Sequence, residues 1–489
     1  MILEEKGLLP IVILQNTQQW DEVMAVALTH LDQRGLNRIS DALQNRVKSI
    51  AVERHYIDKD YRDTFTNFHA KKFSTPDSRC LRLHFFDEVI DHNTIRNSAA
   101  VQPNYLGYVV VRPTRPNCIG RTLLDPRACG LTNCHLSLCS EEVSLQGTVL
   151  NVAGFPFISQ DTDVTVCAQS ALWMLARYFS NRYRVHPEIY PFRVADLTRD
   201  YSIGRVFPSS GLYIWQMAEA LRQIGYSPLI YDRSRYGVKG DFEHLMYTYV
   251  ESGIPILAAF HDHVVVLFGH RSDFESQPPN SANRPPFIFS SHFNREFIGN
   301  DDNGFPYQVL GNGQAPGAMP RKISDVQQFI AGLPEKVFLP AESFQTVVTQ
   351  ILQREDVGSQ SLSPSMSRLT NPLILRLFLT TGRSFKKRLT ARGMGARSVE
   401  EVYRNLPLPH FIWVCEISHT GIYPETVLGE IIWDATRNPY EPDGWITLHY
   451  PEVLVVDQGS ALNGKQNLLT IPITSPNIYP IFENNLVRV

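Results

Sequence analysis

The chain has 489 residues, 43% of them hydrophobic and 19% charged, with a formal net charge of -3 and a pI near 6.6. This composition excludes disorder of the whole chain, and the lack of net positive charge argues against nucleic acid or anionic membrane surfaces as main partners. At this length we expect about two to four domains rather than one hydrophobic core.

The N-terminus and the cysteine content indicate where the protein works. Residues 1–6 are acidic where a secretory signal would be basic, and the apolar run 8–14 that follows is short. The longest apolar candidate, residues 254–268, is interrupted by polar residues, so we predict no membrane span. Seven cysteines form an odd number, which argues against a disulfide framework, and we expect a cytoplasmic protein.

Residues 1–145 are predicted to form an N-terminal mixed α/β domain with a regulatory or substrate-recognition role. Residues 20–43 carry apolar side chains at helical spacing. Residues 81–86 and 106–113 have the composition of strands that end at turn residues. None of these segments looks catalytic.

One stretch of this region contains several potential zinc ligands, namely Cys118, Cys129, Cys134, Cys139 and His135. Structural zinc sites usually use closely spaced CxxC pairs, and these spacings are wider. We therefore favour unrelated cysteines on strands over a zinc site. Because no phosphate-binding, EF-hand or Rossmann motif is evident either, we predict no metal and no cofactor.

The middle region, residues 146–345, begins with a predicted strand over 147–152. A helix is then expected to start at or next to Cys167, because apolar residues recur at helical spacing after it. Potential caps precede this helix, namely Asp161, Thr162, Asp163 and Thr165. Two further helices are predicted over 211–224, with Leu212, Trp215, Met217, Ala218 and Leu221 inward, and over 241–252.

Two buried strands, 254–260 and 264–269, follow in the same region, with His261, Asp262 and His263 between them. Polar side chains between core strands destabilise a fold unless they are paired or used. A strand is also predicted over 287–290, and another from Phe297 ends in the carboxylates of Asp301 and Asp302.

Residues 346–489 are predicted to form a C-terminal α+β domain. The segment 354–367, rich in serine with Gly358 and Pro364, marks the boundary. It is followed by a basic, helix-like piece around 383–388, which we interpret as a solvated face. Strands are predicted over 411–417 and 429–434.

Three residues of the middle region have the types and the order of a cysteine hydrolase site. A thiol at a helix N-terminus is placed to be a nucleophile, which suggests this role for Cys167. His263 would act as the base, and Asp301 would orient its imidazole, with Asp302 as the alternative acid.

Each of these residues also has a purely structural explanation. Cys167 could be a small buried side chain, because free cysteines are among the most buried residues. His263 could be a core-edge histidine, and His261 could replace it as the base. Asp301 and Asp302 could simply cap the turn at Asn303-Gly304. Their joint occurrence favours the catalytic interpretation.

Three segments carry a resemblance to a known family, namely Gln160 with Cys167-Ala168-Gln169-Ser170-Ala171-Leu172, Gly253-Ile254-Pro255-Ile256 with His263-Val264-Val265-Val266-Leu267-Phe268-Gly269, and Phe297-Ile298-Gly299-Asn300-Asp301. The middle region resembles the papain-like cysteine peptidases. The likeness is closest to the bacterial branch that processes bacteriocin leaders of the double-glycine type, and it covers about 200 residues and neither flank.

This resemblance implies an α+β fold with two lobes, a helical lobe bearing Cys167 and an antiparallel β lobe bearing His263 and Asp301, flanked by mixed α/β domains. It also implies a cleft for an extended peptide and an oxyanion hole that uses the side chain of Gln160. The chain departs from the family pattern in two places. Gln160 stands seven residues before Cys167, one more than usual, and Ala168 replaces the usual glycine.

The leading hypothesis is therefore a bacterial, cytoplasmic cysteine peptidase that hydrolyses peptide or amide bonds through a thioester. An alternative is that the same triad carries out transglutamination, deamidation or removal of a protein modifier. A further alternative is an inert papain-like binding module. We expect a protein or peptide as substrate, and the long polar loops suggest regulation by a protein partner.

Overall fold

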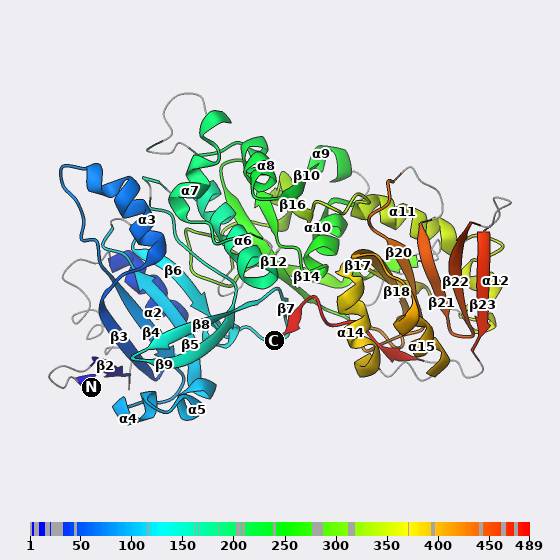
Figure 1. The fold of residues 1–489 in the computed structure, drawn as a ribbon, viewed down its shortest axis with the longest axis horizontal. Helices are drawn as coiled ribbons and strands as arrows, with labels where there is room; N and C mark the ends of the chain where they lie inside the picture. The colour runs from blue at the N-terminus through cyan, green and yellow to red at the C-terminus, as the bar shows by residue number, and fades with distance from the viewer. Residues whose placement is uncertain are drawn as a thin grey trace.

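A computed structural model shows a mixed α/β protein made of three main sheets arranged along its long axis (Figure 1). The N-terminal part lies at one end, the central part in the middle, and most of the C-terminal part at the other end. The structure describes residues 2–3, 9–14, 20, 33–43, 46–114, 117–161, 163–164, 166–184, 186–201, 207, 211–237, 241–275, 287–311, 318–369, 371–392, 397–439, 444–460, 466–473 and 478–489.

The N-terminal sheet has six antiparallel strands in sequence order. Its strands are β1 (Ile2–Leu3), β2 (Ile11–Ile13), β3 (Ser49–Tyr56), β4 (Cys80–Phe86), β5 (Tyr105–Val111) and β6 (Ile119–Leu124). The helices of this part are α2 (Gln33–Leu43), α3 (Lys59–Asn67), α4 (His92–Ile95) and α5 (Ser98–Val101). The predictions of strands over 81–86 and 106–113 are confirmed by β4 and β5. Of the predicted helix over 20–43, only residue 20 and residues 33–43 are described.

A β-hairpin follows, formed by β8 (Cys139–Leu145) and β9 (Thr148–Gly154). Its turn consists of Gln146 and Gly147, which both have positive φ, the conformation that suits a two-residue hairpin loop. The predicted boundary between residues 145 and 146 therefore falls at the tip of this hairpin. The strand predicted over 147–152 is confirmed by β9.

The central sheet has the strand order β10-β16-β11-β12-β14-β15. In addition, β7 pairs with β12, and β25 pairs with β7. Its strands are β7 (His135–Leu136), β10 (Tyr226–Asp232), β11 (Ile256–Ala259), β12 (Val264–Ser272), β14 (Asn294–Asn300), β15 (Gln308–Leu310), β16 (Gln328–Pro334) and β25 (Val487–Arg488). The helices of this part are α6 (Cys167–Tyr183), α7 (Pro191–Asp196), α8 (Ile214–Gln223), α9 (Arg233–Tyr236) and α10 (Asp241–Glu251). All described pairings in this sheet are antiparallel.

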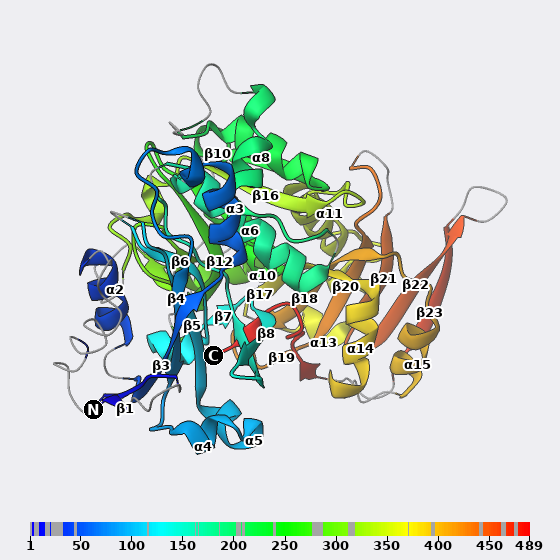
Figure 2. The same ribbon diagram turned by 60° about the vertical axis from the view of Figure 1, so that its left-hand side comes forward.

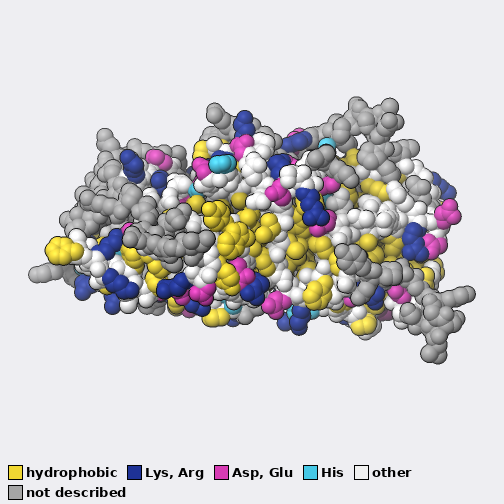
Figure 3. Space-filling model, turned by 90° about the horizontal axis from the view of Figure 1, so that it is seen from above, with side chains coloured by type: hydrophobic (Ala, Val, Ile, Leu, Met, Phe, Trp, Pro, Cys, Tyr) yellow, Lys and Arg dark blue, Asp and Glu magenta, His cyan; other side chains and the backbone are white. Residues whose placement is uncertain are grey.

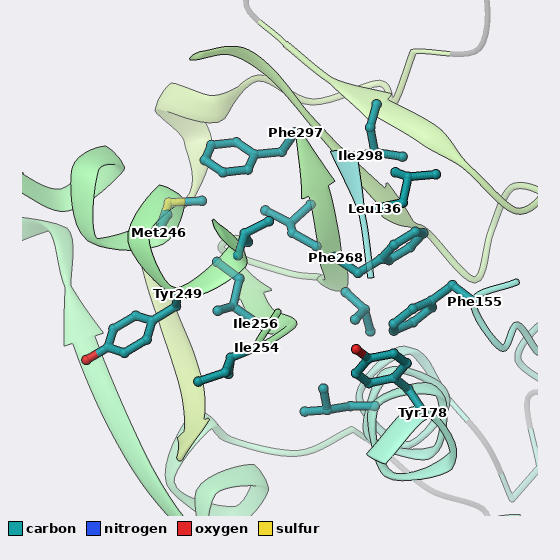
Figure 4. Close-up of a cluster of buried hydrophobic side chains, with 14 of the residues drawn as sticks. Leu136, Phe155, Tyr178, Met246, Tyr249, Ile254, Ile256, Phe268, Phe297 and Ile298 are labelled. Atoms are coloured by element: carbon teal, nitrogen blue, oxygen red, sulfur yellow. The ribbon is translucent and has the colours of Figure 1, made fainter. Parts of the chain in front are cut away.

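The core of the central part lies between α6, α10 and the sheet (Figure 4). Phe155 stacks on Phe268 of β12 with ring centroids 3.8 Å apart, and on Tyr178 of α6 at 5.0 Å. A fully buried aromatic side chain contributes about 1.5–3 kcal/mol by leaving water. These contacts fix α6 against β12.

Helix α8 differs from its prediction over 211–224 in two respects. It begins at Ile214, because the Gln216 side chain accepts a hydrogen bond from the backbone N–H of Tyr213 and closes the N-terminus there. Trp215 was expected to point inward, and this is wrong, since it is 49% exposed while Met217 and Leu221 are buried. Trp215 lies about 200° around the helix from Met217, so the two side chains lie on opposite faces of α8.

Figure 3 shows hydrophobic side chains gathered near the middle of the upper face of the molecule.

The C-terminal sheet has the order β13-β17-β18-β20-β21-β22-β23. Its strands are β13 (Phe287–Phe289), β17 (Leu373–Thr381), β18 (Phe411–His419), β20 (Gly429–Asp434), β21 (Trp445–Tyr450), β22 (Val453–Ser460) and β23 (Gln466–Pro472), and β19 (Thr426–Val427) pairs with β24 (Tyr479–Pro480). The helices are α11 (Ala341–Leu352), α12 (Ser359–Leu362), α13 (Pro364–Ser367), α14 (Gly382–Arg392) and α15 (Arg397–Asn405). The predicted strands 411–417 and 429–434 are confirmed by β18 and β20.

Short strands connect the three predicted regions 1–145, 146–345 and 346–489. β7 of the first region and β25 of the third pair with each other, and β7 pairs with β12 of the second. β13 of the second region pairs in parallel with β17 of the third. The C-terminal end of the described chain therefore returns to the middle of the molecule, as Figure 1 shows.

Among the described residues, no helix is both long and apolar enough to cross a membrane.

Candidate active site

Cys167 is the first residue of α6, which confirms the predicted start of this helix. The following residues, 168–180, are all buried, as expected for a helix at the centre of a core. Cys167 itself is partly exposed. It lies where the first backbone N–H groups of a helix have no partner within the helix and where the macrodipole favours negative charge.

Of the predicted caps of α6, neither Asp161 nor Asp163 is its N-cap residue. The N-cap residue is Val166, whose side chain makes no capping hydrogen bond. Asp161 instead closes a turn of its own, because its Oδ1 accepts a hydrogen bond from the backbone N–H of Val164 at 2.8 Å. Thr162 and Thr165 lie outside the described residues.

His263 is positioned by the tight connection between β11 and β12. Ala259 pairs with Val264, and the backbone N–H of Phe260 donates to the carbonyl of His263 at 2.8 Å. The polar interruption of the apolar run is therefore a hairpin turn. His261 lies exposed at its tip, whereas His263 is 6% exposed. The structure thus places His263, and not His261, at the end of a core strand.

Asp301 reaches His263 because β14 runs antiparallel to β12. Asn300, the last residue of β14, pairs with Val266, so the turn after β14 lies beside the start of β12. The backbone N–H of Asn303 donates to Asp301 Oδ1 at 2.9 Å, and Gly304 donates its N–H to the carbonyl of Asp301. The expected turn is present, and Asp301 caps it while also facing the imidazole.

The side chains of His263 and Asp301 form a short hydrogen bond. Nε2 of His263 lies 2.8 Å from Asp301 Oδ1. Because an ionised carboxylate can only accept, Nε2 carries the proton of this bond. Nδ1 is then the ring nitrogen left for a second partner.

Helix and strand dimensions bring Cys167 to the same imidazole. From Cys167 to Tyr178 the helix rises about 16 Å, and from His263 to Phe268 the strand advances about 17 Å. Since Phe155 stacks on both Tyr178 and Phe268, the two elements are level at one end, and their similar lengths place Cys167 and His263 level at the other. The interaction of the Cys167 thiol with the imidazole of His263 acts to raise the pKa of His263.

The electrostatics of this group favour a charged imidazolium. Burial lowers the pKa of His263, but the interactions with Asp301 and Cys167 and the charges of Asp301 and Asp302 outweigh it and raise this pKa to about 10. Burial acts to raise the pKa of Asp301, yet the hydrogen bond and charge of His263 lower it below its usual range. At neutral pH the pair is therefore an imidazolium and a carboxylate.

Asp302, the alternative acid, is buried behind the same imidazole. It is 1% exposed, and its Oδ1 lies 3.5 Å from His263 Nε2. Burial raises the pKa of Asp302 to about 7; the charge of His263 opposes the increase and that of Asp301 adds to it. Asp301 is therefore the carboxylate that hydrogen-bonds His263.

Gln160 also reaches the site, through Asn303, for which the sequence predicts only a place in a turn. Its Nε2 donates to Oδ1 of Asn303 at 2.6 Å, and Nδ2 of Asn303 lies 3.5 Å from Nε2 of His263. Asn303 thus joins the predicted oxyanion residue to the base. The Asn-Gly pair signals a turn in the sequence, and only the tertiary structure shows its side-chain contacts.

Arg321 is a second residue that sequence reasoning missed. Its guanidinium lies 3.9 Å from Asp301 Oδ2 and 3.2 Å from Asp262 Oδ1, and it stacks over the ring of Phe260 at 5.3 Å. It therefore supports the charge of Asp301 from the side opposite the imidazole. No sequence motif marks it, because it comes from a segment about 20 residues further along the chain.

No protein-family model, curated protein or solved structure matches this chain.

Within the described residues, no cysteine of the N-terminal part belongs to a group of potential metal ligands. All seven cysteines are free thiols, and the only group there with close potential metal ligands is that of His263, Asp301 and Asp302. The expectation that the four clustered cysteines lie on strands is wrong for three of them, since only Cys139 belongs to a strand.

Taken together, the site has the parts that acyl transfer to sulfur needs. It has a partly exposed thiol at a helix N-terminus, a histidine within reach of that thiol, and a carboxylate bonded to the other ring nitrogen. A thiol paired with an imidazolium can react as the thiolate, and the imidazolium can return a proton to a leaving group.

Proposed function

We propose that this protein is a thiol hydrolase that cleaves peptide or amide bonds with Cys167 as nucleophile, His263 as base and acid, and Asp301 as the residue that orients His263. The observation that carries this proposal is the 2.8 Å hydrogen bond from His263 Nε2 to Asp301, which leaves Nδ1 for the thiol at the start of a buried helix.

The proposed reaction proceeds through a thioester. The Cys167 sulfur attacks the substrate carbonyl carbon, and His263 delivers its proton to the leaving amine as the C–N bond breaks. Water then attacks the thioester and gives its proton to His263. The C–S bond breaks, a carboxylic acid is released, and the Cys167 thiolate is restored beside the His263 imidazolium. Asp301 keeps the imidazole in the tautomer that this cycle uses.

We further propose a papain-like arrangement for the central region. Support comes from α6, α7 and α8, which would form the helical lobe, and from the antiparallel sheet that carries His263 and Asp301. In this arrangement the Gln160 amide and the backbone N–H of Cys167 would bind the oxyanion, and the amide is held near the base by Asn303.

The substrate class that we propose is a protein or a peptide, bound in extended form. We also propose that the enzyme works in the cytoplasm, and the seven free thiols support this, because a reducing compartment maintains them.

The test is the pH dependence of alkylation by iodoacetamide, followed by mass spectrometry of each cysteine peptide. We expect Cys167 to be labelled rapidly below about pH 7, because an imidazolium partner stabilises a reactive thiolate. His263→Ala should slow the labelling of Cys167, and His261→Ala, which changes an exposed neighbouring histidine, should not.

The other six cysteines serve as internal controls in the same samples. If Cys167 reacts no faster than these six thiols in the wild-type protein, the thiol hydrolase is excluded and the binding-module hypothesis takes its place.

A further inference from the structure

We propose that the buried cluster of His263, Asp301 and Asp302 is a reversible inhibitory site for a divalent transition-metal ion of the Zn²⁺ type. The inhibitory part of this proposal rests on the proposed thiol chemistry. The binding part does not, since it concerns only these three side chains.

The three side chains have the spacing that a metal ion requires. Nε2 of His263 lies 2.8 Å from Asp301 Oδ1 and 3.5 Å from Asp302 Oδ1, and one ligand atom from each residue lies within 4.8 Å of the others. Tetrahedral Zn²⁺ with bonds of about 2.0–2.1 Å holds its ligand atoms about 3.3 Å apart. Both measured distances differ from this value by about 0.5 Å or less.

The independent observation is the carboxylate of Asp302. The residue is 1% exposed, and neither of its oxygens has a hydrogen-bond partner in the described part of the chain. A buried carboxylate without hydrogen bonds is costly, and buried charges are normally paired, hydrogen-bonded or bound to a metal. Asp302 Oδ1 faces the imidazole of His263, so a metal ion bound between them would neutralise the carboxylate of Asp302.

Two arginines lie near these carboxylates besides the His263 imidazolium, whose Nε2 is 3.5 Å from Asp302 Oδ1. Arg321 approaches the other oxygen of Asp301, Oδ2, at 3.9 Å. The charge of Arg38 acts on Asp302, but no hydrogen bond joins them. One imidazole with two carboxylates suits Zn²⁺, whereas Mg²⁺ and Ca²⁺ prefer sites made of oxygen alone.

Binding at this place would stop the proposed reaction. The ion takes the lone pair of Nε2, and the proton that Nε2 shared with Asp301 leaves for solvent. The positive ion then disfavours a second positive charge on the ring. Without an imidazolium, Cys167 loses the partner of its thiolate and the leaving group loses its acid.

The binding test is a Zn²⁺ titration of the full, chelator-treated chain against a chromophoric zinc indicator. We expect one site per chain that Asp302→Asn weakens by about tenfold or more, as loss of a ligand should. Asp262→Asn is the matched control, because this exposed neighbouring carboxylate bonds Arg321 and is not part of the group. It should bind Zn²⁺ as the wild type does.

A second variant and a spectrum keep the binding test decisive. If Asp302→Asn loses its near-ultraviolet circular dichroism and so does not fold, His263→Gln replaces it, since it removes the nitrogen ligand. Co²⁺ should give visible bands without the charge-transfer band of a thiolate ligand. Equal Zn²⁺ affinity in the wild type and the ligand variant, or binding by cysteines alone, would overturn the proposal.

The inhibition test compares the rate of Cys167 alkylation with and without Zn²⁺ in each protein. The ratio of the rate with Zn²⁺ to the rate without it should fall below one in the wild type and in Asp262→Asn, and EDTA should restore it. In Asp302→Asn this ratio should stay near one. If Cys167 shows no enhanced reactivity even without Zn²⁺, the proposed function fails, while the titration still decides the metal site. Zn²⁺ bound at the site with no change in rate would refute the inhibitory role.

Discussion

The side chain of Asn303 connects two parts of the site that lie far apart in the sequence. It accepts a hydrogen bond from Gln160 and lies beside His263. A residue in this place acts through its neighbours, so we regard it as a positioning residue. Its effect should appear in steps that need the oxyanion hole and not in the intrinsic reactivity of the thiol.

Asn303→Ala should therefore slow acylation by 4-nitrophenyl acetate by about tenfold while Cys167 alkylation by iodoacetamide stays near the wild-type rate. Gln160→Ala should give a similar loss, and the double variant should be no slower than Gln160→Ala alone, because both changes remove one interaction. Additive losses in the double variant would show that Asn303 does not act through Gln160.

A buried histidine outside the site should make the stability depend on pH. His244 on α10 is 8% exposed, and its Nδ1 lies 2.7 Å from Ser291 Oγ. Burial lowers the pKa of His244 to about 4. Histidine in the unfolded chain has a pKa of about 6.5, so the unfolded chain takes up this proton at a higher pH than the folded protein does. The stability that is present above about pH 6.5 is therefore lost as the pH falls towards 4.

His244→Gln should remove this part of the acid sensitivity. At about 1.4 kcal/mol for each pH unit, His244 accounts for a loss of about 3 kcal/mol in the free energy of unfolding. Urea unfolding at about pH 7.5 and pH 4.5 measures the difference, with His261→Gln at an exposed histidine as control. An acid loss in His244→Gln as large as that of the wild type would contradict the assignment.

At the scale of elements, helix α6, which begins at Cys167, is held by the N-terminal part of the chain. Asp60 of α3 accepts hydrogen bonds from Arg177 at 2.5 Å and from the Trp173 indole at 3.0 Å, and all three side chains are buried. In the view of Figure 2, α3 lies in front of α6, and these hydrogen bonds join the two helices. The N-terminal part is therefore a structural support of the site, whatever its role in substrate recognition.

Asp60→Ala should destabilise the protein by about 3 kcal/mol, because it leaves buried Arg177 with one of its two carboxylate partners and Trp173 without an acceptor. The free energy of unfolding in urea at pH 7.5 measures this. Asp196→Ala, which breaks an exposed pair with Arg193, should cost less than about 1 kcal/mol. Similar losses in the two variants would argue against a special anchor at Asp60.

At the scale of the whole molecule, a buried charge network joins the central and C-terminal sheets. Arg376 of β17 donates to Glu251 of α10 and to Glu416 of β18, each at 2.6 Å, and His270 of β12 lies 2.5 Å from Glu251. Burial acts to raise the pKa of Glu251, but Arg376 and His270 outweigh it and lower this pKa. The two parts therefore share one network of charges as well as the exchanged strands.

Arg376→Met should cost about 3–5 kcal/mol in the free energy of unfolding, because it leaves two buried carboxylates without their shared cation. Heat unfolding followed by calorimetry at pH 7.5 measures it, with Arg404→Met on the exposed face of α15 as control. If the Arg376 variant unfolds like the control, the network does not bind the two parts together.

Local sequence patterns predicted much of the secondary structure, and they named three residues that the structure brings together at the candidate site. The start of α6 at Cys167 and the strands on both sides of His263 follow from apolar periodicity, which depends on near neighbours in the chain. The order of Cys167, His263 and Asp301 along the chain also suggests the chemistry of a cysteine hydrolase.

Tertiary structure alone decided which of the candidate residues lie together. The pairing of β14 with β12 places Asp301 at 2.8 Å from His263 and Asp302 behind it, and the hairpin turn exposes His261. Asn303 and Arg321 join the site through contacts that no pattern along the chain encodes. Strand register and long-range packing depend on residues far apart in sequence, so only the folded chain fixes them.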